Sequence, residues 1–456
     1  MKSPRIMLAA PASGSGKTLI TCGILQALVN RGLQVASFKC GPDYIDPMFH
    51  QRVIGAKSGN LDTFFTDPAT TRYLFGRAAA DQNISVVEGV MGYYDGLGGV
   101  CLEGSSYDVA RTLDIPVVLL VNCAGQSLSV LSVMKGFLEY QSPSMIQGVI
   151  FNRMSPMIYE RLREIAEHQF SVRVLGYVPP IKDLDLKSRH LGLVLPHEVE
   201  ELKENLQRLA EILEETLDLD GLIALSQEAP SLSYHPPEFF QRAERKPVSI
   251  ALAKDEAFCF TYRDNLELLE QLGARLVPFS PLEDKEIPRE CRGMILSGGY
   301  PELHARRLSE NVSLRQSIRE AIARGMPCIA ECGGFLYLHE ELEGPEGICY
   351  PMVGSIPGRA YGTERLGRFG YITLTARQDQ LLLAQGEQVR GHEFHYWESE
   401  NCGESLEAQK PVGKRSWSCG HGTKTLYAGF PHLFYYSNPQ VALNFLKKCE
   451  ESPCLS

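Results

Sequence analysis

The sequence predicts an α/β protein with two parallel-sheet domains, and three observations carry this prediction. Short apolar runs alternate with helical patterns over residues 1–225. The pattern breaks in the proline-containing segment 226–246, which we interpret as a linker, and the alternation restarts over residues 247–450. Such alternation is typical of βαβ units, and a length of 456 residues suits two or three domains.

Six apolar runs of the first domain are expected to be buried strands. They are bounded by Gly, Pro or polar residues and do not alternate with polar residues, as in a sheet covered on both faces; they span 5–10, 34–39, 84–89, 116–122, 146–152 and 172–178. A helix is expected from Lys17 to Arg31. Its apolar stripe is followed by Gly32 at the position of a C-terminal cap.

The second domain, after the linker, is expected to show the same alternation of strands and helices. Strands are expected over 247–255, 274–280, 293–299 and 327–332, and helices near 262–272 and 311–325. Both domains are therefore predicted to have parallel sheets, with ligands gathering at the carboxyl ends of the strands.

Residues 10–18, "APASGSGKT", form a candidate phosphate-binding loop between the first strand and the first helix. The pattern G-x-x-x-x-G-K-[ST] is matched at Gly16, Lys17 and Thr18, whereas Pro11 stands in place of the first glycine. The alternative is a tight turn that happens to contain these residues. The flanking strand and helix favour the phosphate loop.

The loop's chemistry points to ATP with Mg²⁺. The backbone around Gly14 and Ser15 would direct N–H groups at phosphate, and the helix dipole would add to this attraction. Lys17 would reach the outer phosphates and the Thr18 hydroxyl would ligate Mg²⁺. Ala12 stands where partition-type ATPases carry a second lysine, which disfavours a switch ATPase.

Acidic residues follow two of the predicted strands. "FKCGPDYIDP" supplies Asp43 and Asp46, and "VVEGVMGYYDG" supplies Glu88 and Asp95. Because the carboxyl ends of parallel strands share one edge, these carboxylates would lie near Thr18. Glu88, which ends an apolar run, is the best metal candidate; the alternative for each carboxylate is a solvated loop residue.

The stretch "MPCIAECGGFLYL" (326–338) predicts a nucleophile elbow. A strand runs into Cys332, which is followed by Gly333 and Gly334 and then by an apolar helix. The helix N-terminus is expected to lower the pKa of the thiol. The preceding loop offers the amides of Gly298 and Gly299 for an oxyanion hole. The alternative, a buried structural cysteine, is our interpretation for the other twelve cysteines.

A thiol nucleophile also needs a base, and histidine is the usual one. His432 in "YAGFPHLFYYSNP" competes with His392 and His395 in "RGHEFHYWES". The residues themselves leave these three open.

Composition narrows the setting. A net charge of −10 argues against a nucleic-acid partner. The cysteines have no C-x-x-C spacing, and neither a secretory segment nor a transmembrane stretch is evident, so we expect reduced thiols in the cytoplasm and no membrane partner. The oligomeric state is not readable, although a homodimer is compatible with the sequence.

Nearly the whole chain, about 3–450, resembles the cobyrinate a,c-diamide synthase family, the glutamine-dependent amidotransferases of cobalamin synthesis. The resemblance rests on several motifs taken together: "SGSGKT", "FKCGPDYIDP", "VEGVMGYYDG", "AKDEAFCFTYRDNLELL", "SGGYPELHARRLSEN", "AECGGFLYL", "GHEFHYWE" and "HLFYYSNP". It implies a P-loop NTPase-like domain of the dethiobiotin-synthetase type, joined to a class I glutamine amidotransferase domain.

The resemblance also implies roles for residues. Cys332 would be the glutaminase nucleophile and His432 its base. Many class I glutaminases carry Glu two residues after that histidine; here the position is Phe434, so the orienting residue stays open. The substrates would be ATP, glutamine and cobyrinate, whose a and c acetates would be amidated through acyl phosphates.

In this scheme Mg²⁺ and the substrate share the acidic motifs. We assign Thr18, Glu88 and Asp46 to Mg²⁺, and Asp43, Tyr44 and Asp95 to substrate. Arg365 and Arg368, in "YGTERLGRFGY", are candidate partners for the macrocycle's other carboxylates; a surface loop is the alternative.

Three rival functions remain at this point. Ni-sirohydrochlorin a,c-diamide synthase would use the same chemistry on a related tetrapyrrole. A P-loop switch that binds partners is disfavoured by Ala12 and the cysteine elbow. A glutaminase-like binding module with an inactive site is the third.

Overall fold

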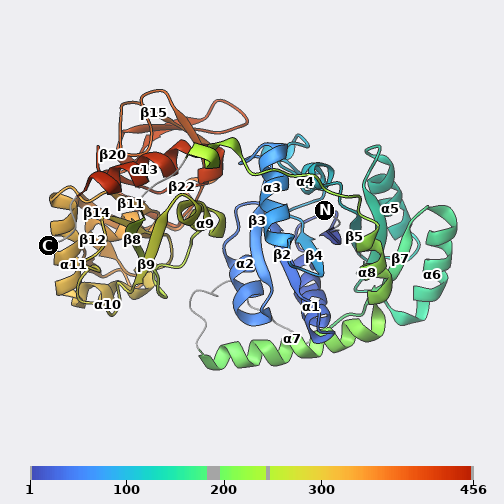
Figure 1. Cartoon of the computed structure of the whole chain (residues 1–456). Coiled ribbons are helices and arrows are strands. Elements are labelled where there is room, and N and C mark those ends of the chain that lie inside the picture. The colour runs from blue at the N-terminus through green and yellow to red at the C-terminus, as the bar shows by residue number, and fades with distance from the viewer. Residues whose placement is uncertain (1–2, 182–195, 243–246, 453–456) are drawn as a thin grey trace. The chain divides into compact units, whose positions relative to one another are not determined.

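The computed structural model describes residues 3–181, 196–242 and 247–452. By its internal contacts the chain divides into two units, Met1–Pro237 and Glu238–Ser456 (Figure 1). Each unit is an α/β layer structure built on its own central sheet.

The first unit contains a seven-stranded sheet in the order β3-β2-β4-β1-β5-β6-β7, with all neighbouring strands parallel. Its strands are β1 (Arg5–Ala9), β2 (Val35–Cys40), β3 (Lys57–Leu61), β4 (Ile84–Glu88), β5 (Val117–Asn122), β6 (Ile146–Asn152) and β7 (Arg173–Val178). The six predicted strands are confirmed. The edge strand β3 was not predicted, because its sequence KSGNL has no apolar run.

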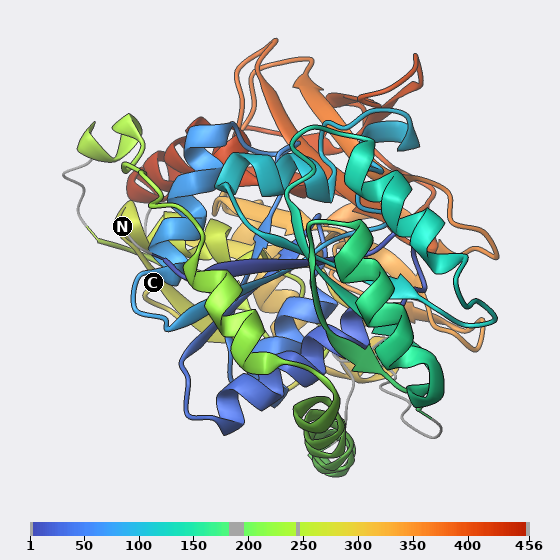
Figure 2. The same cartoon turned by 90° about the vertical axis from the view of Figure 1, so that its right-hand side faces the viewer.

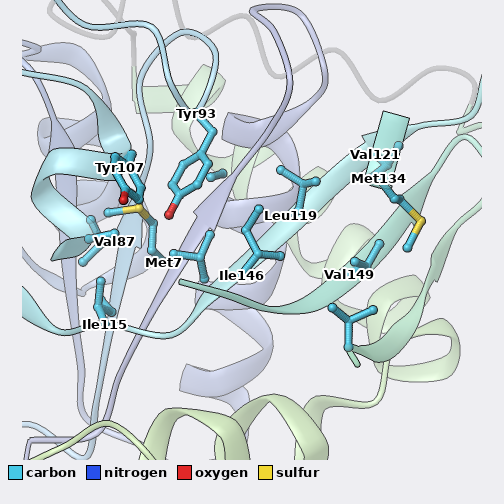
Figure 3. Packing of buried hydrophobic residues seen from close by; sticks show 14 of the residues in the cluster. Met7, Val87, Tyr93, Tyr107, Ile115, Leu119, Val121, Met134, Ile146 and Val149 are labelled. Atoms are coloured by element: carbon cyan, nitrogen blue, oxygen red, sulfur yellow. The ribbon is translucent and has the colours of Figure 1, made fainter. Parts of the chain in front are cut away.

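The central strands of this sheet contribute side chains to two buried clusters, one on each face of the sheet. Along β1, Met7 and Ala9 belong to one buried cluster, and Ile6 and Leu8 belong to the other. This follows from the period of two in a strand, which sends successive side chains to opposite faces. Figure 3 shows the first cluster, in which Met7 lies near Tyr93 and Tyr107.

Helices cover both faces of the sheet. The face of Met7 is covered by α3 (Pro68–Ala79), α4 (Ser106–Leu113), α5 (Val130–Glu139) and α6 (Pro156–Gln169). The other face is covered by α1 (Lys17–Asn30), α7 (Pro196–Thr216) and α8 (Leu219–Gln227). Helix α7 packs along α1 and is seen end-on in Figure 2. Two short segments, α2 (Ile45–Phe49) and the π-helix η1 (His50–Ile54), follow β2, and the 3₁₀ turn η2 (Leu97–Gly99) follows β4.

The first part of the expected linker lies against the first unit. Helix α8 continues to Gln227, and Leu232 is buried in the cluster of Met7. The Pro230 carbonyl accepts a hydrogen bond of 2.8 Å from the buried Arg5 guanidinium. The sequence did not predict this packing. The segment is rich in proline and polar residues, and a single buried leucine produces no hydrophobic periodicity.

The second unit contains a six-stranded sheet in the order β20-β21-β11-β10-β8-β9, which is parallel except for the edge pair β20–β21. Its strands are β8 (Val248–Ala253), β9 (Ala274–Phe279), β10 (Gly293–Leu296), β11 (Cys328–Glu331), β20 (His421–Gly422) and β21 (Leu426–Gly429). The helical segments are η4 (Glu238–Arg242), α9 (Arg263–Gln271), η5 (Pro301–His304), α10 (Ala305–Glu310), α11 (Val312–Ala323), α12 (Gly333–Tyr337), η6 (Tyr435–Ser437) and α13 (Gln440–Glu451).

Two further sheets are inserted between α12 and α13. One has the order β13-β12-β14-β17 and the other β19-β18-β15-β16-β22. Their strands are β12 (His339–Glu343), β13 (Cys349–Pro351), β14 (Ile356–Gly362), β15 (Phe369–Ala376), β16 (Gln388–Phe394), β17 (Trp397–Ser399), β18 (Leu406–Gln409), β19 (Ser416–Cys419) and β22 (His432–Leu433). In the motif 361–371, for which a surface loop was the alternative, residues 361–362 and 369–371 lie on β14 and β15, whereas 363–368, which include Arg365 and Arg368, connect these strands.

In the ranges that the structure describes, no helix combines the length and the apolar character needed to cross a membrane.

Candidate active sites

The loop after β1 has the curvature of a phosphate-binding loop. Gly14 and Gly16 have φ of 74° and 89°, in the left-handed region. A Cβ at Gly16 would lie 2.6 Å from Asn152 Nδ2, so this position excludes a side chain on two grounds. Ser15 is held from both sides, because its Oγ donates to the Ala12 carbonyl (2.8 Å) and its carbonyl accepts from Asn152 Nδ2 (2.8 Å).

Lys17 opens helix α1 and folds back over the loop. Its Nζ donates to the Met91 carbonyl (2.5 Å) and to the Ala12 carbonyl (3.3 Å). Burial lowers the pKa of Lys17 and the nearby Lys39 lowers it further, whereas Glu88 opposes both. The cation is thus held at the loop's mouth by neutral carbonyl oxygens, which phosphate oxygens can replace.

Behind the loop, four side chains form one polar chain. Thr18 Oγ1 donates to Glu88 Oε1 at 2.7 Å. The Lys39 ammonium contacts the same Glu88 oxygen at 2.5 Å and Asp46 Oδ2 at 2.7 Å. The second Glu88 oxygen, Oε2, is buried and accepts no hydrogen bond from the residues that the structure describes.

The protonation states of Glu88 and Lys39 depend on two opposing effects, burial and ion pairing. Burial raises the pKa of Glu88, and Lys39 opposes that rise. Burial alone would lower the pKa of Lys39, but Glu88 and Asp46 outweigh it and raise the pKa. Lys39 therefore stays an ammonium and stabilises both carboxylates.

The residues around Thr18 fit Mg²⁺. A hydroxyl and a carboxylate with a free buried oxygen are the kind of oxygen ligands that Mg²⁺ takes, and Mg²⁺ commonly binds through one or two protein groups plus substrate phosphates. Asp46 is engaged with Lys39, so its predicted place among the ligands stays a prediction. Within the described ranges no group of three or more His, Cys, Asp or Glu side chains has a metal-binding arrangement.

The predicted substrate residues lie on the same edge of the sheet. Asp43 Oδ1 accepts the backbone N–H groups of Ile45 (2.8 Å) and Asp46 (3.0 Å), which shapes the turn into α2. Burial raises the pKa of Asp43, and Asp46 adds to the rise. Tyr44, buried, directly precedes α2. Asp95 accepts from the Gly92 N–H at 2.9 Å.

In the second unit, Cys332 has the backbone of a nucleophile elbow. Its φ of 47° and ψ of −101° lie outside the ordinary regions, and it immediately precedes α12. Its N–H donates to the Gly429 carbonyl at 2.8 Å, which links the end of β11 to β21. Strain of this kind at a non-glycine residue is typical of functional sites.

The expected lowering of the thiol pKa was wrong for this structure. Burial raises the pKa of Cys332, and the buried Glu302 adds to the rise. Only the Gly333 N–H opposes it, and α12 has just five residues. Burial also raises the pKa of Glu302, to about 7. The thiol therefore needs a base to become a thiolate.

The three histidines occupy different environments. His392 and His432 are cross-strand partners on β16 and β22, with ring centroids 5.1 Å apart. His392 Nδ1 is 2.9 Å from the Tyr262 hydroxyl. His395 stacks on Phe430, with centroids 3.8 Å apart. Burial lowers the pKa of His432 to about 3, and His395 contributes, so His432 is neutral at rest.

Glu331, which the sequence reasoning did not single out, lies against His432. Its Oε2 is 3.9 Å from His432 Nδ1, and its Oε1 accepts the Leu433 N–H at 3.2 Å. Burial raises the pKa of Glu331 to about 8, and the Leu433 N–H opposes the rise. Glu331 ends β11 and directly precedes Cys332, so one short segment supplies both an acid and a thiol.

The glycine pair 298–299 lies between the histidine and the elbow. A Cβ at Gly298 would be 2.5 Å from His432 Cε1, and one at Gly333 would be 2.9 Å from the Gly299 nitrogen. The close approach at Gly298 tolerates no side chain. The loop is thus near enough to both for its amides to serve the predicted oxyanion hole.

Lys39, Asn152 and Glu331 are three polar residues near these sites that the sequence reasoning did not single out. Lys39 and Glu331 stand inside motifs already singled out, and each places a charge near the end of a buried strand, which was a usable signal. Asn152 ends β6, a strand without a flanking motif.

Arg365 and Arg368 are placed differently from each other. Arg365 is exposed. Arg368 lies over the Trp417 ring at 5.8 Å, and its Nη1 is buried with no hydrogen-bond partner among the described residues.

Comparisons with known proteins agree with this division of the chain. The profile of the CobQ/CobB/MinD/ParA nucleotide binding domain matches residues 6–194, and that of the CobB/CobQ-like glutamine amidotransferase domain matches residues 249–437.

Three curated relatives match over nearly their whole length, each bearing the name cobyrinate a,c-diamide synthase. The protein of Caldanaerobacter subterraneus subsp. tengcongensis is 38% identical over 450 residues, covering 97% of this chain and 98% of the relative. That of Listeria monocytogenes serotype 4b is 40% identical, covering 95% and 97%. That of Priestia megaterium is 35% identical, covering 99% and 98%.

Proposed function

The chain belongs to the cobyrinate a,c-diamide synthase family, and from this premise we propose how its residues divide the glutamine-dependent diamidation of cobyrinate in cobalamin biosynthesis. The enzyme is an ATP-using amidotransferase ligase. The observation that carries the proposal is that one chain holds a phosphate loop backed by Glu88 and a cysteine elbow backed by His432 and Glu331.

The first unit activates the substrate carboxylate. A carboxylate oxygen attacks the γ-phosphorus of ATP, the bond to the β-phosphate oxygen breaks, and an acyl phosphate and ADP form. Lys17 moves from its carbonyl partners to the phosphate oxygens and stabilises the charge that develops there. The amides of Gly14, Ser15 and Gly16 orient the phosphates at the helix N-terminus. Asp43, Tyr44 and Asp95 position the substrate.

Thr18 and Glu88, with Asp46 as a third predicted ligand, would hold Mg²⁺, and the ion would supply positive charge that offsets the negative charge of the phosphates. Lys39 keeps Glu88 Oε1 in place while Oε2 stays available as a ligand. The pairing lets a fully buried carboxylate persist beside the loop.

Replacing Glu88 with Gln tests the metal assignment. We expect the Mg²⁺ concentration for half-maximal amidation to rise by at least roughly 10-fold, because a charged ligand is lost. An Mg²⁺ titration at fixed ATP measures this, with thermal unfolding confirming the fold. The control is Glu103→Gln at an exposed position of the same unit. An unchanged titration in Glu88→Gln would remove Glu88 from the ligand set.

The second unit releases ammonia from glutamine. His432 takes the thiol proton and the Cys332 sulfur attacks the side-chain carbonyl. His432 then gives this proton to the amide nitrogen as the C–N bond breaks, which yields a thioester and ammonia. The Gly298 and Gly299 amides stabilise the oxyanion. Water then hydrolyses the thioester to glutamate. The ammonia displaces phosphate from the acyl phosphate, which leaves an amide.

Glu331 orients His432 and stabilises its imidazolium form. A neutral His432 with a pKa near 3 is a weak base by itself. An ionised carboxylate 3.9 Å from Nδ1 favours proton uptake. Many class I glutaminases use a Glu two residues after the histidine for this role. Here we assign the role to Glu331, the residue before Cys332.

Glu331→Gln should therefore lower glutaminase kcat/KM by roughly 10²-fold. In the unaltered enzyme, kcat/KM should rise with pH through about 8, because Glu331 carries its proton below that pKa and cannot stabilise an imidazolium. The variant should lose this limb, which a purely structural role would leave in place. Glutamate release measured between pH 6 and 10 decides the matter, and a retained limb near 8 would refute the role.

The whole proposal is tested by an assay with cobyrinate, ATP and glutamine, in which product mass counts the carboxylates converted to amides. Two amidations, each needing both cosubstrates, are expected. The same assay with Ni-sirohydrochlorin tests the closest rival, which the names of the curated relatives do not favour. A homodimer and a cytoplasmic location stay predictions, to be checked by sedimentation and by fractionation.

A further inference from the structure

Two buried hydrogen-bond acceptors face each other near the cysteine elbow. Glu393, on β16, is completely buried, and His395 is 5% exposed. Glu393 Oε2 lies 3.5 Å from His395 Nε2. Both carboxylate oxygens and Nε2 lack a hydrogen-bond partner among the residues that the structure describes. Buried polar atoms in native proteins are nearly always satisfied, by protein, ligand or ordered water, so the pair has room for a small hydrogen-bond donor.

The histidine's other nitrogen shows which kind of ligand is needed. His395 Nδ1 is 2.6 Å from the Trp397 carbonyl, which can only accept, so Nδ1 carries the proton. In the neutral ring Nε2 is then an acceptor, and an ionised Glu393 offers acceptors alone. Two acceptors at this separation are satisfied by a small molecule with several N–H or O–H donors between or beside them.

The pair lies next to the nucleophile within the second unit. The ring of His395 stacks on Phe430, and the preceding Gly429 accepts the Cys332 N–H. Burial and Glu302 are the main causes that raise the pKa of Cys332, and the charge of Glu393 makes a smaller contribution in the same direction. The pair is therefore linked to the nucleophile through the adjacent residues Gly429 and Phe430.

Positive charge surrounds Glu393 without using its oxygens. Burial would lower the pKa of Arg368, but Cys402 and Glu393 outweigh it and raise that pKa. Burial lowers the pKa of Lys410, and Glu393 opposes this fall. The Lys410 ammonium donates instead to the Phe369 carbonyl. These cations offset the cost of burying a carboxylate and leave its oxygens available to a neutral donor.

We propose that Glu393 and His395 form a holding site for the ammonia released at Cys332. Ammonia has three N–H donors and one lone pair, so its donors can satisfy the two Glu393 oxygens and His395 Nε2. No covalent bond changes in this step. The inference rests on the proposed glutaminase reaction and adds to it the first residues that receive its product.

Glu393→Gln tests the site. The new amide nitrogen can donate directly to His395 Nε2, which satisfies the pair and closes the site at nearly constant volume. The matched control is Glu398→Gln, because Glu398 lies 3.8 Å from the Nδ1 of the same histidine, on the side already satisfied by Trp397. Each variant is assayed as the full chain with cobyrinate, ATP and glutamine.

The readout is glutamate formed per amide formed, together with incorporation of ¹⁵N from ¹⁵N-ammonium in the medium. The unaltered enzyme and Glu398→Gln should give one glutamate per amide and an almost unlabelled product. Glu393→Gln should form several-fold more glutamate than amide and incorporate more ¹⁵N, because ammonia escapes and exchanges. A ratio of one with an unlabelled product in Glu393→Gln, or equal leakage in both variants, would overturn the proposal.

If Glu393→Gln does not fold, His395→Asn gives the same readout. Its amide can reproduce the bond to the Trp397 carbonyl but lacks an acceptor at the Nε2 position, so leakage is again expected, and tight coupling would refute the site. If the unaltered enzyme showed no amidation at all, this would instead contradict the proposed function. A site that holds only water predicts one glutamate per amide in every variant.

Discussion

Replacement of Lys17 with Ala should remove amidation whichever nitrogen source is supplied. The Lys17 ammonium is the cation at the mouth of the phosphate loop, bonded to the Ala12 and Met91 carbonyls. Loss of a preorganised charge at a developing anion costs roughly 10²–10³-fold in rate. Amide formation should fall by at least this much with glutamine and with ammonium chloride alike.

The control for Lys17→Ala is Lys135→Ala, an exposed lysine on α5 of the same unit. It should leave both rates unchanged. Glutamate release by the second unit should survive in Lys17→Ala when glutamine is supplied alone. Ammonia-supported amidation near the unaltered rate would contradict the role of this lysine at the phosphates.

Replacement of Cys332 with Ser should separate the two halves of the reaction. Glutamine-dependent amidation should fall on the order of 10⁴-fold or more, because a hydroxyl is a far weaker nucleophile here than a thiolate. Amidation with ammonium chloride should persist, since the phosphate loop belongs to the other unit. Parallel rates with both nitrogen sources measure this.

Cys349→Ser, at a half-buried cysteine of the same unit, is the matched control and should retain both activities. Loss of both activities in a correctly folded Cys332→Ser protein would contradict a separate ammonia-using half-reaction. Retention of glutamine-dependent turnover would show that another residue is the nucleophile.

The secondary structure of the sheet cores was largely predictable. The run 116–122 is apolar up to its last residue, Asn122, because both faces of a parallel sheet are covered, and β5 spans Val117–Asn122. Strand β3 was not predictable in the same way, because Lys57–Leu61 is mostly polar and is identified only by its pairing with β2. The two inserted sheets were not predicted because their strands are half-exposed and lack long apolar runs.

The site residues also differ in how far the sequence could identify them. The loop at Gly16, Lys17 and Thr18 and the elbow at Cys332 are contiguous motifs, so their chemistry was readable from residue types and order. Asn152 could not be identified that way, because it joins the loop through a contact across 137 residues. The direction of the Cys332 pKa also depended on burial, which outweighs the helix N-terminus.

The sequence by itself indicated two α/β domains, a phosphate loop and a cysteine elbow, because each is encoded by local order and periodicity, and its motifs together resemble one family. Only the tertiary structure decided which charges meet. Lys39 between Glu88 and Asp46, Glu331 beside His432, and Glu393 facing His395 are all products of strand register and burial. Proximity in space sets pKa and hydrogen bonding, and distance along the chain does not record it.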